Sequence, residues 1–397
     1  MELRIIIGLT SITKSTTRGT FSMTNQKKSD ETRNRKQDHI EICCNKLHEI
    51  EMSVTTGFED IHFVPNALPD INFDDINLNT EFLKHDFDYP IFISSITGGT
   101  KLAKKINTRL AKLAEKYKIG IGVGSQRGVL EEEADTDSFA VIRQQAPNAF
   151  VAANLGAVQF NYDFTIKHAE KAIEMINADA LILHLNPLQE VIQPEGNTNF
   201  SNLTVKIKEI GKELKQPLIV KEVGSGISRD IALDLVDGGI PAIDVAGAGG
   251  TSWSQIEAIR AKQQGLTKQQ KTGELFKDWG LPTAVSTIEV SKFQDMVEII
   301  SSGGIRNGLQ AAKALAIGAK LVGIALPLAC LAATGTEKQL INWVEQFIYE
   351  LKTAMFLVGA EELEGLQFAP MVVTGKTAEW LTIRGLEEEL EMINLRG

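Results

Sequence analysis

The residue run 301–308, which reads Ser-Ser-Gly-Gly-Ile-Arg-Asn-Gly, has the composition of an anion-binding loop. The apolar run Val297–Ile300 before it is typical of a buried strand, and Leu309–Ile317 after it has a helical pattern. Glycines let the backbone approach a ligand closely, and the first amides of a helix attract negative charge to the same spot. Near the C-terminal end of a parallel barrel, such a site usually holds the phosphate of a cofactor or substrate. The loop therefore predicts a phosphorylated ligand.

Polar residues that could take part in chemistry also follow the other apolar runs, where the predicted strands end. In chain order they are Ser95, Thr97, Ser125, Gln126, Arg127, Asn154, His184, Asn186, Gln189, Glu190, Lys221 and Thr251. Each alone has an ordinary structural explanation, since His184 could be a satisfied core residue and Lys221 could pair with Glu222. Positions that follow the strands of a barrel converge on one face, so their occurrence together favours a functional site.

The elements that must position these residues are short β-branched runs that alternate with amphipathic segments. The candidate strands are Ile91–Ser94, Ile121–Val123, Val151–Ala153, Leu181–Leu185, Leu218–Glu222, Ala242–Val245, Val297–Ser301 and Leu321–Ile324. Most are separated by about thirty residues, the length of one βα unit. Eight such units predict an α/β protein with a (β/α)₈ TIM barrel, and the count of eight disfavours the alternative of a doubly wound open sheet.

Composition and charge argue against several classes of partner. Apolar residues make up 43% of the 397-residue chain, enough for one large core, and the net charge is −10. Binding to nucleic acid or to an anionic membrane needs a basic face, and the longest apolar runs are shorter than a membrane span. Cys43, Cys44 and Cys330 have neither disulfide nor metal-site spacing, which indicates a reducing cytoplasm. We therefore expect a cytoplasmic protein with a small-molecule ligand.

Residues 1–34 do not fit the barrel pattern. They contain many Ser and Thr and few acids in the first part, as a transit peptide does, but no long apolar core or clean cleavage site follows. We favour a disordered or mis-started leader, with Met23 as the natural first residue. The domain prediction is a leader over 1–34 and a single barrel domain over 35–397.

Further segments should flank or interrupt the barrel. Asp38–Asp88 predicts a helix over Ile40–Met52 followed by an irregular N-terminal arm. Trp253–Gly280, between the sixth and seventh strands, predicts an insertion that is either a lid or interface element or a plain surface loop. Glu337–Leu357 and Thr377–Ile393 predict amphipathic C-terminal helices that could form subunit contacts.

Motifs spread over most of the chain occur together in an informative combination. They are Arg35–Ile40, Thr97–Gly99, Gly122–Arg127, Asn154–Ala157, His184–Glu190, Lys221–Gly224, Asp244–Trp253 and Ser302–Arg306. With these motifs the chain resembles, from Arg35 to about Leu386, the type 2 isopentenyl-diphosphate isomerases, which are FMN-dependent barrels of isoprenoid synthesis. The Arg-Lys-x-Asp-His and His-x-Asn-x-x-Gln-Glu motifs are far more specific to these isomerases than the flavin motifs. Ile96 departs from the family, where Met is common.

The resemblance implies a ligand for each part of the site. FMN would be bound by Ser95, Ile96, Thr97, Ser125, Asn154, Lys221, Thr251, Gly304, Ile305, Arg306, Ala325 and Leu326. The substrate diphosphate and the allylic carbons would be contacted by Arg35, Lys36, Ser125, Gln126, Arg127, His184, Asn186 and Gln189. Glu190 would bind a Mg²⁺ ion that bridges the diphosphate, because Mg²⁺ usually combines one or two carboxylates with phosphate oxygens.

The implied reaction moves a carbon–carbon double bond between isopentenyl diphosphate and dimethylallyl diphosphate. The sequence offers no pair of carboxylates well placed for this, so the hypothesis is that reduced FMN acts as acid and base. Lys221 would stabilise negative charge on the flavin, Gln189 would hold or relay a proton, and His184 would line the reacting carbons. NADPH is the expected reductant. The resemblance also suggests a homo-oligomer, a tetramer or an octamer.

Three other functions remain open. An FMN-dependent α-hydroxy-acid oxidase or dehydrogenase needs a basic histidine near the late strands, but every histidine lies at or before His184. A barrel that oxidises or reduces a nucleotide ring usually has a catalytic cysteine on an active-site loop, whereas Cys330 follows the last strand in an apolar context typical of a core residue. A non-catalytic phosphate-binding scaffold predicts that several strand-end polar groups have been lost, and none has.

Overall fold

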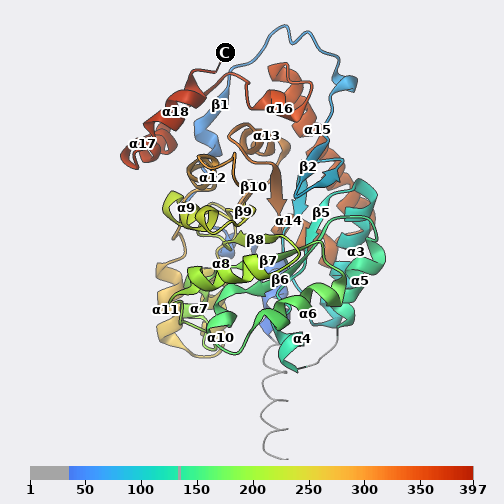
Figure 1. The fold of residues 1–397 in the computed structure, drawn as a ribbon, viewed down its shortest axis with the longest axis vertical. Helices are drawn as coiled ribbons and strands as arrows, with labels where there is room; N and C mark the ends of the chain where they lie inside the picture. The colour runs from blue at the N-terminus through green and yellow to red at the C-terminus, as the bar shows by residue number, and fades with distance from the viewer. Residues whose placement is uncertain (1–34, 133–135, 397) are drawn as a thin grey trace, which may run out of the picture.

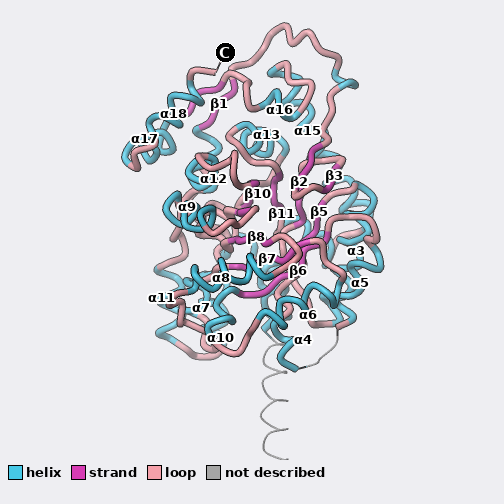
Figure 2. Tube along the Cα trace, viewed as in Figure 1, coloured by secondary structure: helices cyan, strands magenta, loops and turns pink. Residues whose placement is uncertain are grey.

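The computed structural model describes residues 35–132 and 136–396, and its centre is a closed barrel of eight parallel strands (Figures 1 and 2). The strands are β4 (Ile91–Ile93), β5 (Gly120–Gly122), β6 (Val151–Gly156), β7 (Ala180–His184), β8 (Leu218–Lys221), β9 (Ala242–Asp244), β10 (Glu298–Ser302) and β11 (Leu321–Ile324). They follow the chain order around the barrel, which closes where Val322 on β11 pairs with Ile91 on β4. The predicted barrel and its eight strands are confirmed, with ends shifted by a few residues. The leader predicted over 1–34 lies outside the described residues.

Helices cover the outside of the barrel, as Figure 2 shows in cyan. Between the strands they are α3 (Lys101–Tyr117), α4 (Arg127–Glu132), α5 (Asp137–Gln145), α6 (Ile166–Ile176), α7 (Pro187–Ile192), α8 (Leu203–Glu213), α9 (Arg229–Asp237), α12 (Thr283–Ser291) and α13 (Gly308–Ala316), with the 3₁₀ turn η3 (Ala157–Asn161). In α3, Thr100 caps the first turn through the amide of Ala103, and Ile106 and Leu110 bury one face.

A small hairpin closes the N-terminal end of the barrel. It consists of β2 (Thr80–Phe82) and β3 (His85–Phe87), within the segment that we predicted to be irregular. Phe82 and Phe87 are buried in one cluster with Phe92 and Phe150, and the ring of Phe150 meets each of the other three at a tilted or edge-on angle. The packed aromatic cluster fills this end of the barrel, so a ligand can enter only at the C-terminal ends of the strands.

The N-terminal arm runs alongside the barrel, in blue in Figure 1. It begins with a helix over residues 35–45, followed by α2 (Leu47–Ile50), η1 (Phe58–Asp60), β1 (Ile61–Phe63) and η2 (Phe73–Asp75). The single helix predicted over Ile40–Met52 therefore starts earlier and is interrupted at Lys46. Two backbone hydrogen bonds tie the arm to the loop after β9, from Met52 N to Gly250 O (2.9 Å) and from Ser252 N to Ile50 O (2.8 Å).

The insertion between β9 and α12 is a pair of helices, α10 (Trp253–Gln263) and α11 (Thr267–Leu275). The residues from Ile256 to Ala261 on α10 are all buried, because α10 packs against α11, α7 and α2. The alternative of a plain surface loop is therefore wrong for α10, which is part of the barrel mouth.

The C-terminal part contains α14 (Leu326–Thr334), α15 (Glu337–Val358), α16 (Leu363–Leu366), β12 (Met371–Val373), α17 (Gly375–Ile383) and α18 (Glu387–Asn394). The helix predicted over Glu337–Leu357 is confirmed, whereas Thr377–Ile393 is two helices that Gly385, with φ of 70°, separates. β12 pairs antiparallel with β1, so the arm and the C-terminal region hold each other. No helix within the described residues combines the length and the apolarity needed to cross a membrane.

Candidate functional site

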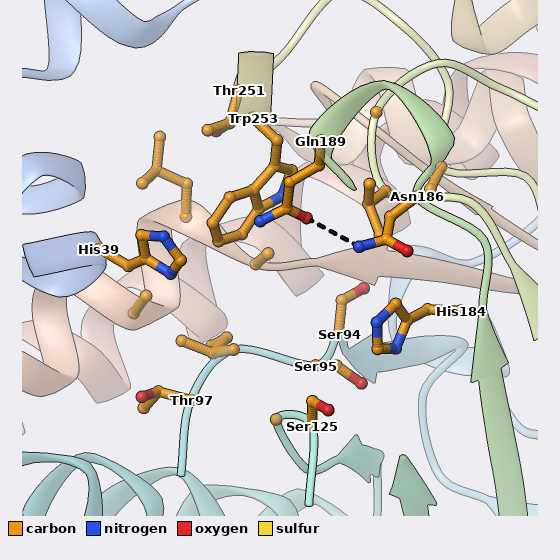
Figure 3. Close-up of a pocket in the computed structure, with 18 of the residues that line it drawn as sticks. His39, Ser94, Ser95, Thr97, Ser125, His184, Asn186, Gln189, Thr251 and Trp253 are labelled. Carbon is orange, nitrogen blue, oxygen red and sulfur yellow. Dashed lines mark hydrogen bonds between the residues drawn. The ribbon is translucent and has the colours of Figure 1, made fainter. Parts of the chain in front are cut away.

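A pocket opens at the C-terminal ends of the barrel strands and is covered on one side by the arm helix of residues 35–45. Most of the predicted site residues line it, although they come from distant parts of the chain (Figure 3). They are Arg35, Lys36, Ser95, Ile96, Thr97, Ser125, Arg127, Asn154, His184, Asn186, Gln189, Glu190, Lys221, Thr251, Gly304, Arg306, Ala325 and Leu326. The structure therefore brings the arm motif and the strand-end motifs together around one cavity.

Two predicted residues have side chains outside this lining. Gln126 is fully buried, where its Nε2 donates to Ala172 O (2.8 Å) and its Oε1 accepts from the amide of Asn154 (2.9 Å). Gln126 thus supports β6 beneath Asn154 and does not present a polar group to the pocket. Ile305 is also fully buried and belongs to the apolar core, which leaves only its backbone for a ligand.

A chain of hydrogen bonds holds His184 at the end of β7. His184 Nδ1 lies 2.7 Å from Asn154 Oδ1, and Asn154 Nδ2 donates to Ser95 Oγ (2.6 Å). Burial, followed by the positive charge of Lys221 and two nearby arginines, lowers the pKa of His184 to about 3, so the ring is neutral near pH 7. Because the Asn154 oxygen can only accept, Nδ1 carries the proton and Nε2 is left as an acceptor.

The short helix α7 presents three polar side chains to the pocket. Asn186 precedes the helix, and Pro187 at its first position places Gln189 and Glu190 one turn above Asn186. Asn186 Nδ2 donates to Gln189 Oε1 (3.3 Å, dashed in Figure 3) and to Glu190 Oε1 (3.0 Å). Asn186 Oδ1 is buried and has no hydrogen-bond partner within the described chain. That oxygen can therefore accept a hydrogen bond from a ligand.

Glu190 is buried at 6% exposure, and its second oxygen accepts a hydrogen bond from the amide of Asn197. The described residues contain no group of three or more His, Cys, Asp or Glu side chains that could hold a metal ion. A metal at Glu190 would therefore need most of its ligands from a bound molecule and water, which suits Mg²⁺ with a diphosphate.

Glu257 on α10 is a site residue that the sequence analysis missed. Its Oε1 lies 2.9 Å from His39 Nε2 and accepts from Gln189 Nε2 (3.0 Å), and its Oε2 accepts from Arg260 (2.6 Å). Burial raises the pKa of this fully buried carboxyl, but His39 and Arg260 outweigh it and lower the pKa to about 2. The one signal in the sequence was a Glu and an Arg three residues apart, each beside an isoleucine in a helical pattern.

Glycines shape the loop after β10. Gly303 and Gly304 have φ of 104° and 76°, and a Cβ on Gly304 would lie 2.4 Å from Gly249 O. The predicted contribution of the following helix is wrong in detail, because its first amides already have partners inside the protein. In the first turn of α13, the amide of Gly308 donates to Glu350 Oε2 (2.9 Å) and that of Gln310 donates to Asn307 Oδ1 (2.9 Å). An anion here would rely on the glycine backbone, the Arg306 side chain and the start of α14.

Replacing Gly304 by alanine should weaken flavin binding, because the added methyl meets Gly249 O and forces a positive φ on a residue with a side chain. We expect a loss of about 1–3 kcal/mol in the free energy of unfolding and a lower FMN content. Gly239→Ala is the matched control: its φ is 77° and its Cβ would have nothing within 4 Å. Thermal unfolding and flavin absorbance of both proteins measure the difference. Equal FMN content in both variants would contradict the proposal that the Gly303–Gly304 loop binds the flavin phosphate.

The charge of the pocket is opposite to that of the whole chain. Five cationic side chains line it, and Glu190 is the one carboxylate among the lining residues that the structure describes. The cations are Arg35, Lys36, Arg127, Lys221 and Arg306. A protein of net charge −10 that gathers cations around one cavity attracts an anionic ligand there.

Comparison with known sequences gives a consistent family. The chain is 46% identical over 357 residues to the isopentenyl-diphosphate delta-isomerase of Pyrococcus furiosus, a match that covers 88% of this chain and 89% of that protein. It is 44% identical over 363 residues to the isopentenyl-diphosphate delta-isomerase of Halobacterium salinarum, covering 91% and 99% of the two proteins. Residues 167–372 match the family model described as FMN-dependent dehydrogenase.

Solved structures support the fold. A mutant flavocytochrome b2 with pyruvate bound superposes with a TM-score of 0.60 at 18% identity, covering 87% of this chain and 84% of that one. A mandelate oxidase mutant with a monooxide FMN adduct gives a TM-score of 0.55 at 17% identity, covering 81% and 90%. At this level of identity the likeness extends to the barrel and its flanking helices.

Proposed function

The chain belongs to the isopentenyl-diphosphate delta-isomerase family, and on that premise we propose that it interconverts isopentenyl diphosphate and dimethylallyl diphosphate by moving a double bond. The observation that carries the proposal is the meeting of two distant motifs at one pocket. Arg35, Lys36 and His39 from the arm helix face Gln189 and its neighbours on α7, with Glu257 joining His39 to Gln189. This arrangement combines cations for a diphosphate with groups that can hold a proton.

FMN fits the barrel side of the pocket. The glycine backbone around Gly304, the side chain of Arg306 and the start of α14 at Ala325 and Leu326 would hold its phosphate. The remaining contacts would come from Ser95, Ile96, Thr97, Ser125, Asn154, Lys221 and Thr251. When bound and reduced, FMN would supply the acid and base that add and remove the allylic proton. Lys221 is buried at 7% exposure and would place a positive charge beside the flavin.

The substrate diphosphate would be held between the arm and the strand ends. Arg35 and Arg127 offer planar forks that suit phosphate oxygens, and Lys36 already reaches the same place by donating to Ser125 O (3.1 Å). His184 would contact the diphosphate or the allylic carbons through Nε2. Asn186 Oδ1, which has no hydrogen-bond partner within the described chain, could accept a hydrogen bond from the same substrate. Gln189, held by Glu257, is the side chain through which the protein would hold or relay a proton.

We propose that Glu190 binds Mg²⁺ together with the substrate diphosphate. Glu190→Gln removes the charge and keeps the shape, so the Mg²⁺ concentration for half-maximal activity should rise about tenfold or more. A Mg²⁺ titration of activity after removal of divalent ions with EDTA measures the effect. An unchanged Mg²⁺ dependence in this variant would remove Glu190 from the metal site.

We also propose NADPH as the reductant, a cytoplasmic location and a homo-oligomeric state, as a tetramer or octamer. Large apolar side chains that remain exposed on the insertion and at the C-terminus support the oligomer, among them Leu275 (79%), Trp279 (60%), Ile383 (77%) and Leu395 (78%).

The test is an anaerobic assay of the purified protein with FMN, Mg²⁺ and NADPH, in which isopentenyl diphosphate is followed by NMR. We expect dimethylallyl diphosphate to appear without stoichiometric consumption of NADPH. Stoichiometric NADPH loss with a reduced product would instead identify a flavin reductase or dehydrogenase. The α-hydroxy-acid oxidoreductase alternative is favoured by the fold alone, at 17–18% identity.

A further inference from the structure

Arg260 on α10 is a buried cation that contacts carboxylates from three separate segments. Its NH1 lies 2.6 Å from Glu257 Oε2, its NH2 lies 3.3 Å from Glu195 Oε1, and its Nε lies 3.6 Å from Asp38 Oδ2. The Arg260 side chain is 4% exposed. A charge buried to this degree is stable only with partners in good geometry, so the three carboxylates and the arginine require one another.

Glu257 and Glu195 also contact residues that line the pocket, and Asp38 lies on the helix that carries some of them. Glu257 Oε1 bonds both His39 and Gln189, and Glu195 Oε1 lies 3.5 Å from NH1 of Arg35. Asp38 belongs to the same helix as Arg35 and His39. Arg260 therefore lies behind the pocket lining and is joined to it on the arm side and on the α7 side.

The arm helix has a small apolar contact with α10, where Ile42 packs against Ile256 and Ile259. Within residues 35–45, Ile40 and Ile42 are the buried residues, and the other described side chains of the helix are half-buried or exposed. His39 adds an edge-on ring contact to Trp253 (5.1 Å between centroids), and Figure 3 shows the two rings side by side. The attachment between this helix and α10 therefore combines that small apolar cluster with the polar contacts of Asp38 and His39.

Loss of Arg260 would leave three carboxylates facing one another. Glu257, Glu195 and Asp38 all lie within 3.6 Å of this one guanidinium, so without it the buried charge of Glu257 would face two partly exposed negative charges and repel them. Asp38 is on the arm helix, which would then keep only His39 and the small apolar cluster around Ile42 as its contacts with α10, so we expect this helix to be the part that moves away.

We propose that Arg260 is a positioning residue that fixes the helix of residues 35–45 over the pocket, so that Arg35, Lys36 and His39 stand in place before substrate arrives. The link to substrate binding rests on the proposed function. The attachment of the helix to the barrel does not, and it can be measured without any substrate.

The first test is amide hydrogen exchange of the full-length protein, followed by mass spectrometry of peptides that cover residues 35–45. Arg260→Gln and the milder Asp38→Asn should both raise exchange in these peptides by about tenfold or more, with little change in the barrel strands. Arg384→Gln is the matched control, because Arg384 also bridges a fully buried glutamate, Glu289, and an exposed aspartate, Asp230. Arm exchange that is unchanged in Asp38→Asn, or raised equally in Arg384→Gln, would overturn the proposal.

The second test separates positioning from folding by kinetics. Asp38 is 39% exposed, so Asp38→Asn should fold normally, and we expect it to raise KM for isopentenyl diphosphate about tenfold while kcat changes less than about threefold. Arg260→Lys should restore part of the substrate binding that Arg260→Gln loses, since lysine carries the positive charge but lacks the planar guanidinium group. If KM in Asp38→Asn equals that of the wild type, Arg260 serves folding only. If no variant, wild type included, isomerises the substrate, the proposed function fails while the exchange result still stands.

Discussion

Glu257→Gln should lower kcat for isomerisation by about 10²–10³-fold while the protein still binds flavin. Glu257 Oε1 accepts from Gln189 Nε2 and contacts His39, so its charge fixes which end of the Gln189 amide faces the pocket. A neutral amide at position 257 could donate as well as accept, and Gln189 would lose its single orientation. The measurement is the rate of dimethylallyl diphosphate formation with reduced flavin at saturating substrate, together with the flavin content.

The control for this variant is Glu289→Gln. Glu289 is also fully buried and also pairs with an arginine, Arg384 (2.9 Å). Its partners Arg384 and Arg229 do not line the pocket, whereas Glu257 bonds the lining residues His39 and Gln189. Breaking either buried pair should cost about 3 kcal/mol in the free energy of unfolding, so both variants should unfold at lower temperature. Only Glu257→Gln should lose kcat. A kcat within about threefold of wild type in Glu257→Gln would show that the Gln189–Glu257 pair has no part in proton transfer.

Lys221→Met should keep the barrel intact but make the flavin harder to reduce. Lys221 Nζ donates to the carbonyl of Glu222 (2.5 Å) and lies 3.8 Å from Asp244 Oδ2, which has no hydrogen-bond partner within the described chain. Its positive charge stands at the end of β8, and removing it should destabilise negative charge on the reduced flavin. We expect a fall in the reduction potential of bound FMN on the order of 30–90 mV, with a loss in kcat of about 10²-fold.

A redox titration of bound FMN checks the potential, and the isomerisation rate checks the catalytic loss. Lys313→Met is the matched control, because Lys313 on α13 also donates to a backbone carbonyl, Phe58 O (2.8 Å), and does not line the pocket. That variant should change thermal stability alone. If Lys221→Met and the wild type have the same potential and the same rate, Lys221 does not act on the flavin.

The two variants test different parts of the proposal. Glu257→Gln acts on the side of the pocket formed by α10, α7 and the arm, whereas Lys221→Met acts on the strand ends beneath. A loss of kcat in Glu257→Gln without a change in flavin potential would show that the Gln189–Glu257 pair affects proton transfer without altering the flavin. A loss of kcat in both Glu257→Gln and Lys221→Met would indicate that the Lys221 charge and the Gln189–Glu257 pair both act on the rate-limiting step.

Much of the fold could be predicted because its signals are local. The barrel strands are short apolar runs buried on both faces, and the helical crossovers set the spacing between runs. Counting these runs was therefore enough to predict an eight-stranded barrel. The β2–β3 hairpin was missed because its strands are three residues each and contribute buried phenylalanines rather than a repeating pattern. The break between α17 and α18 was missed because the pattern of apolar residues continues across Gly385.

Local patterns in the chain were enough to predict the barrel, the polar residues at the C-terminal ends of its strands, and most of the lining of the pocket. It could do so because strand ends in a barrel converge by topology, whatever the details of packing. The packing of distant segments was needed to show that Glu257, paired with Arg260, joins His39 to Gln189, that Gln126 faces the core, and that first-turn amides of α13 already have partners. The contact of His39 with Glu257 joins segments 218 residues apart, through the packing of the arm on α10, and leaves no pattern in either segment alone. The partners of Gln126 and Gly308 lie 46 and 42 residues away on other elements, so they too are set by packing and not by local pattern.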